Sequence, residues 1–105
     1  MGSTDKESGY VKFQNELYDA VLRQPLRITQ LKAVLYIIRK TVGFNKPEDR
    51  ISITKMAEEV GCSRRAMINA VHDLNRMWII EMGRVTPGRT TAMKINDPSR
   101  WDQGM

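Results

Sequence analysis

The residues with the clearest chemistry lie in one short segment that begins with Ser63, Arg64 and Arg65. Cations at the start of a helix oppose the helix dipole by up to about 1 kcal/mol, so local stability does not explain these two arginines. A polyanion does explain them. Asn69 follows one turn later, and an asparagine amide pairs with adenine as an arginine fork pairs with guanine. The residue types therefore predict contact with DNA.

The candidate DNA contacts form two groups. The first group belongs to a predicted helix and comprises Ser63, Arg64, Arg65, Ile68, Asn69, His72 and Arg76. In this group, Ile68 would touch a thymine methyl. The second group surrounds a Pro-Gly turn and comprises Arg84, Thr86, Arg89 and Thr90, which would contact sugar, phosphate or a minor groove. The alternatives are a solvated basic helix face, a core-margin role for Ile68, and an exposed turn that arginine keeps soluble.

The elements that must position these residues follow from the segment 51–80. Ser52 is the expected N-cap of a helix over residues 53–60, whose apolar residues recur at helical spacing. Gly61 is expected to end that helix in a left-handed conformation. Ser63 then caps a helix from Arg64 to about Met77, which is predicted to bury Met67, Ala70, Val71 and Leu74. Two helices joined this closely predict a helix-turn-helix.

A β-hairpin is predicted to follow. Residues 78–85 and 90–95 favour strands, and Pro87-Gly88 between them suits a type II turn. The fold class expected is therefore mainly α with a small β-hairpin, a winged helix-turn-helix that places its second helix in the major groove of DNA.

The spacing of apolar residues in the first half of the chain predicts two more helices, and a short strand is expected at Ile51. Asn15 is expected to cap a helix within residues 10–24 that buries Leu17 and Val21, with Phe13 and Leu22 as further candidates. A helix over residues 29–41 is expected to bury Leu31, Val34, Leu35 and Ile38, widened by Ile28, Ala33 and Ile37. We expect a disordered tail over residues 1–9, one domain over 10–96, and a tail or linker over 97–105 unless Trp101 packs back.

Composition and charge agree with a small nucleic-acid-binding domain. A chain of 105 residues with 41% hydrophobic and 28% charged residues has room for one core. Residues 61–96 hold six basic and two acidic side chains, a balance of +4 out of a net charge of +5. One cysteine and one histidine predict neither a disulfide nor a metal site. No motif predicts an enzyme, a cofactor or a membrane span, so we expect a cytoplasmic protein.

A specific resemblance covers residues 9 to about 85. The run IIRKTVGFNKPEDRIS at residues 37–52, the opening GYVKFQNELYDAVLR at 9–23, and LNRMWII at 74–80 resemble the N-terminal domain of the phage lambda-type replication protein O family. General winged-helix repressors resemble this chain only in the later helix-turn-helix. The resemblance implies recognition of a phage or prophage replication origin on double-stranded DNA in a bacterial host, often by dimers. The resemblance also implies that the replication machinery is recruited through a separate C-terminal region, which we expect to be absent from this sequence.

Two other functions compete with origin recognition. A transcriptional regulator could use the same fold on an operator, and nothing in residues 51–95 excludes it. A protein-binding winged helix would need a less basic wing and an exposed apolar patch. A homodimer would use a surplus of apolar residues that could equally fill the core, namely Ile28, Tyr36, Ile37, Met82 and Trp101.

Overall fold

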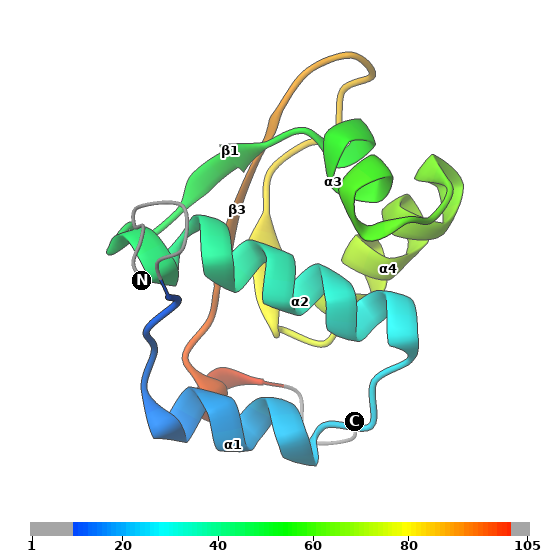
Figure 1. The fold of residues 1–105 in the computed structure, drawn as a ribbon. Coiled ribbons are helices and arrows are strands. Elements are labelled where there is room, and N and C mark those ends of the chain that lie inside the picture. Colours follow the sequence, from blue (N-terminus) through cyan, green and yellow to red (C-terminus); the bar gives the residue numbers. More distant parts are fainter. Residues whose placement is uncertain (1–9, 102–105) are drawn as a thin grey trace.

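The computed structural model of the protein describes residues 10–101, in which four α-helices pack beside a small sheet (Figure 1). The tail expected over residues 1–9, and residues 102–105, lie outside the described part. The elements in chain order are α1 (Asn15–Arg23), α2 (Ile28–Lys40), the 3-10 helix η1 (Val42–Phe44), β1 (Asp49–Ile51), α3 (Ile53–Val60), α4 (Arg64–Arg76), β2 (Ile80–Met82), β3 (Thr91–Ile95) and the 3-10 helix η2 (Pro98–Arg100). The predicted fold class, a mainly α winged helix-turn-helix, is confirmed.

The sheet has three antiparallel strands in the order β1-β3-β2. Arg50 of β1 lies opposite Ala92 of β3, and Glu81 of β2 lies opposite Lys94 on the other edge of β3. The second strand is shorter than the predicted 78–85. β2 begins at Ile80, two residues later than predicted, because α4 ends in a Schellman motif. In this motif the Ile79 amide donates to the Leu74 carbonyl at 3.1 Å, and Trp78 takes a left-handed φ of 62°.

Both helices of the helix-turn-helix begin and end as the local sequence predicts. The Ser52 hydroxyl accepts a hydrogen bond from the Lys55 amide at 3.1 Å, and the Ser63 hydroxyl accepts one from the Ala66 amide at 3.0 Å. Gly61 lies between them with a φ of 83°, in the region that glycine adopts without strain. These contacts fix the short turn that sets α4 against α3.

The core forms where α2 packs against α4, α3 and the sheet. The predicted residues of α4 are all buried, and so are Ile53, Met56 and Ala57 of α3, whereas Val60 is half-buried. Each large apolar side chain taken fully out of water contributes about 1.5 to 3 kcal/mol before the entropy cost of folding. The α2–α4 contact therefore holds the helix that carries most of the candidate DNA contacts.

Four expectations for the first two helices are wrong. Leu22, Ile28 and Leu35 are 68%, 69% and 46% exposed. The buried arc of α2 is instead centred on Val34 and Ile37, because the outer face of α2 is also apolar and periodicity alone does not choose between the two faces. Asn15 is the first residue of α1 rather than its cap; Gln14 occupies the cap position without a side-chain hydrogen bond.

The segment after β3 packs back onto the domain. Trp101 is 3% exposed and its indole Nε1 donates to the Asn96 carbonyl at 2.9 Å. The Asn96 side chain in turn donates to the Trp78 carbonyl at 2.9 Å. Of the two alternatives expected for Trp101, packing is therefore the one observed, and the packed chain continues at least to this residue.

Tyr36 of α2 makes one pH-dependent contact. Its burial, with a smaller contribution from its hydrogen bond to Glu59 of α3, raises the pKa of the Tyr36 phenol to about 12. The unfolded chain releases this proton near pH 10, so the stability from Tyr36 is complete below that pH and is lost as the pH rises toward 12. We expect unfolding free energies measured from pH 9 to 11.5 to fall more steeply for the wild type than for Tyr36→Phe. Parallel curves would contradict this assignment.

Candidate nucleic-acid interface

The outer face of α4 carries a single polar ridge. Arg65, Asn69, His72 and Arg76 recur at i, i+4, i+7 and i+11, and all four are exposed. Ile68 lies beside the ridge and is half-buried, with its side chain packed partly against the core. Four of the seven predicted helix contacts thus form one continuous solvent-facing row, and Ile68 contributes only its exposed part.

The one acid on α4, Asp73, is engaged by two neighbouring side chains. Gln30 of α2 donates from Nε2 to Asp73 Oδ2 at 3.2 Å, and Arg76 forms an ion pair with the other carboxylate oxygen. The negative charge of Asp73 is therefore compensated by Arg76, which leaves Arg64 and Arg65 as the uncompensated charges of this helix. An incoming phosphate would meet a net positive surface at the start of α4.

At the start of α4, the three predicted residues differ in what they contact. The Ser63 hydroxyl is the helix cap described above. The Arg64 Nε donates to the Thr54 hydroxyl of α3 at 3.0 Å, and both side chains are exposed. The Arg65 side chain has no hydrogen bond or ion pair within residues 10–101. One arginine is therefore held by the preceding helix, and the other has no such anchor within the described residues.

The wing is the loop between β2 and β3, and Figure 1 shows it projecting past α3 on the side of the domain opposite α1. The Arg89 amide donates to the Thr86 carbonyl at 3.1 Å, and Gly88 has a φ of 76°, which is the geometry expected of a type II turn. Arg84, Thr86, Arg89 and Thr90 are all exposed. The sequence-predicted wing residues therefore gather on one exposed loop.

Arg50 is a basic residue of this surface that sequence reasoning missed. It lies on β1, and it donates from Nε to the Thr90 hydroxyl at 2.9 Å and from Nη2 to the Thr90 carbonyl at 3.0 Å. Thr90 therefore contacts Arg50 as well as facing solvent. The two residues are 40 positions apart in the chain, so only the pairing of β1 with β3 brings them together. No local sequence signal indicates this contact.

Charged side chains connect the base of the wing to the segment that follows β3. Glu81 of β2 forms ion pairs with Lys94 of β3 at 3.6 Å and with Arg100 of η2 at 3.2 Å. The Arg100 guanidinium also lies over the Trp78 ring, 5.6 Å from its centroid. These exposed contacts contribute little individually, but they connect both strands of the hairpin to the segment that follows it.

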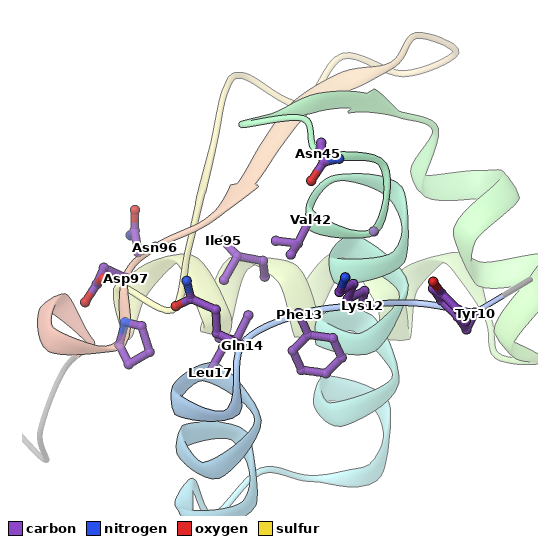
Figure 2. A pocket seen from close by; sticks show the side chains of 12 residues that line it. Tyr10, Lys12, Phe13, Gln14, Leu17, Val42, Asn45, Ile95, Asn96 and Asp97 are labelled. Carbon is purple, nitrogen blue, oxygen red and sulfur yellow. The ribbon is translucent and has the colours of Figure 1, made fainter.

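A hollow of about 820 Å³ lies at the other end of the domain and includes none of the predicted DNA contacts. Phe13, Leu17, Val42 and Ile95 line it together with polar residues such as Lys12 and Asn45 (Figure 2). Among residues 10–101, no three histidine, cysteine, aspartate or glutamate side chains come together in a way that could hold a metal ion. No helix in the same range is long and apolar enough to cross a membrane.

Comparison with known proteins identifies relatives of this domain. Residues 3–97 match the model of the family described as bacteriophage replication protein O. The chain is 36% identical over 77 residues to replication protein O of Escherichia phage lambda, an alignment that covers 73% of this chain and 23% of the relative. It is 34% identical over 79 residues to DNA replication protein gp18 of Salmonella phage P22, covering 74% of this chain and 29% of that relative. The chain thus spans less than a third of the length of either relative, and the match to the family model over most of its residues shows that it belongs to the bacteriophage replication protein O family.

Proposed function

We propose that this domain binds double-stranded DNA sequence-specifically and recognises a phage or prophage replication origin. The observation that carries the proposal is the exposed ridge Arg65–Asn69–His72–Arg76 on a helix whose one acid is neutralised within the fold. A recognition helix of a winged helix-turn-helix enters the major groove, where its N-terminal residues and its exposed row meet base edges and the flanking phosphates. The wing supplies further basic side chains from a separate loop.

Each group of residues has a distinct role in the proposed complex. The start of α4, with Ser63, Arg64 and Arg65, would meet phosphates and the first base edges. Asn69 would read an adenine, and the exposed part of Ile68 would touch a thymine methyl. Arg84 and Arg89 of the wing, with Thr86 and Thr90, would add affinity that depends little on sequence, and Arg50 would hold the wing in place through Thr90.

The replication role rests on the family and not on the winged helix itself, since a transcriptional regulator uses the same fold on an operator. We therefore propose that the domain acts at the initiation of DNA replication in a bacterial host cell. Its role there is to bind DNA and not to act as an enzyme. The names of the two relatives, a replication protein and a DNA replication protein, support this choice. We assign contact with the replication machinery to the parts of the longer relatives that do not align with this chain, and not to this domain.

Self-association is part of the proposal. Of the five apolar residues expected in surplus, Ile37 and Trp101 are buried and Tyr36 and Met82 are half-buried, whereas Ile28 is exposed. Tyr18 and Leu22 of α1 and Leu35 of α2 are exposed as well. These helices, rather than α4, would hold a second copy, which leaves both recognition helices accessible to DNA.

Fluorescence anisotropy across a salt series tests the function. The duplexes are repeated sequences from the origin region of the source genome, promoter DNA from the same genome, and a scrambled duplex of equal composition. Tight binding to the repeats, at least about 1,000-fold above the scrambled duplex, supports origin recognition. Preference for promoter DNA supports a regulator instead. Weak and equal binding with a steep salt dependence would contradict sequence-specific recognition.

Asn69→Ala tests the base-reading role of the ridge. We expect the variant to lose discrimination at one base position, by about 1 to 3 kcal/mol, because the bidentate pair with adenine is lost while phosphate contacts remain. Selection of preferred sites from a randomised duplex pool measures the preference at each position. Asn15→Ala makes the same chemical change at an exposed residue of α1, outside the proposed interface, and is expected to leave every preference unchanged. An unchanged preference at every position in Asn69→Ala would contradict the assignment.

A further inference from the structure

Arg64 and Arg65 are adjacent and equally charged, yet the structure holds them differently. The Arg64 Nε donates to the Thr54 hydroxyl of α3, at 3.0 Å, across the turn of the helix-turn-helix. Arg65 lies on the outer ridge and has no such anchor among residues 10–101. The difference arises from helix geometry, because Arg64 occupies the margin of α4 that borders α3 and Arg65 is turned about 100° away from it.

The anchor engages one particular part of the guanidinium group. An arginine has five N–H donors, one on Nε and four on the two terminal nitrogens. With Nε engaged by Thr54, the two terminal nitrogens of Arg64 keep their donors, and none of them has a protein partner in the described range. An arginine uses such a pair of donors to bind O6 and N7 of guanine in two parallel hydrogen bonds.

We propose that Thr54 is a positioning residue that makes Arg64 the guanine-reading arginine of this domain, while Arg65 serves a phosphate. Thr54 acts by limiting the rotation of a long, flexible side chain before DNA arrives. Ordering one such side chain on binding costs a factor of about 2 to 12 in affinity, and a side chain that is already held avoids part of that cost. The proposal deepens the proposed function and rests on it.

The test uses Thr54→Val, which keeps the shape of the side chain and removes the hydroxyl acceptor. Thr54 is exposed, so the substitution leaves the core intact, and thermal unfolding confirms that the variant is folded. We expect affinity for the preferred duplex to fall about 2- to 12-fold, with the loss confined to duplexes that carry guanine at one position. Thr54→Ser restores the hydroxyl and is expected to restore the preference. Arg65→Ala is the contrasting variant, because it should weaken all duplexes alike and reduce the salt dependence.

A double-mutant cycle separates positioning from a merely structural role. In an Arg64→Ala background, Thr54→Val is expected to have no further effect, because the group that Thr54 positions is absent. Additive losses, or an unchanged guanine preference in Thr54→Val, would overturn the proposal while leaving DNA binding by the domain established. Absence of any sequence preference in the wild-type protein is a different result, because it overturns the proposed function itself and this inference with it.

Discussion

Trp101→Ala is expected to lower the free energy of unfolding by about 3 to 5 kcal/mol, the range for removing a large aromatic side chain from a core. The indole is 3% exposed and donates to the Asn96 carbonyl, so alanine would leave both a cavity and an unpaired carbonyl. A domain of this size has a total stability of about 5 to 15 kcal/mol. The loss would therefore be a large share of the whole. Urea unfolding followed by circular dichroism measures it.

The matched control for Trp101→Ala is Trp78→Ala. It makes the same chemical change at a residue that is 51% exposed and whose ring centroid lies 5.6 Å from the Arg100 guanidinium. We expect it to cost about 1 kcal/mol or less. Equal losses in the two variants would show that burial is not the cause. No loss in Trp101→Ala would mean that the segment after residue 96 behaves as a linker in solution.

The double substitution of Arg64 and Arg65 by alanine is expected to weaken binding to the preferred duplex about 100-fold. It removes the two charges of α4 that the fold does not compensate, one proposed to read a base and one to meet a phosphate. The slope of log affinity against log salt concentration should become shallower by about one, because one phosphate contact is lost. Anisotropy titrations at several salt concentrations give both quantities.

A control with the same change in charge distinguishes a local contact from a general effect of net charge. Arg23 of α1 and Arg39 of α2 are both exposed and lie outside the helix-turn-helix and the wing. Their double substitution by alanine should leave specific affinity within about threefold of the wild type, because distant exposed charges are screened at physiological salt. If both double variants lose affinity equally, α4 is not the recognition helix.

The features that could be predicted from the sequence depend on neighbouring residues. Ser52 and Ser63 cap their helices by hydrogen bonds to amides three residues later, and Gly61 and Gly88 take positive φ angles that favour glycine. The helix-turn-helix, the wing turn and the exposed row on α4 follow from such short-range rules. These predictions succeeded because each interaction lies within a few residues along the chain.

The predictions of buried residues that failed concern helices with two usable faces. The outer face of α2 carries Ile28 and Leu35, which fit an apolar stripe as well as the residues that are in fact buried. Periodicity shows that a helix has an apolar side, but the packing partner decides which side enters the core. The contact between α2 and α4 makes that choice, and it leaves Ile28 and Leu35 in solvent.

The winged helix-turn-helix and the residues on its exposed basic face could be predicted from sequence alone, because capping, turn geometry and helical spacing are local. How those residues are held depends on tertiary contacts. Gln30 reaches Asp73 across 43 positions, Arg50 reaches Thr90 across 40, and Arg64 reaches back ten residues to Thr54. Trp101 joins the core only because the chain folds back after β3. Such contacts depend on which elements pack together, and that arrangement is set by the burial of the whole core rather than by any short segment.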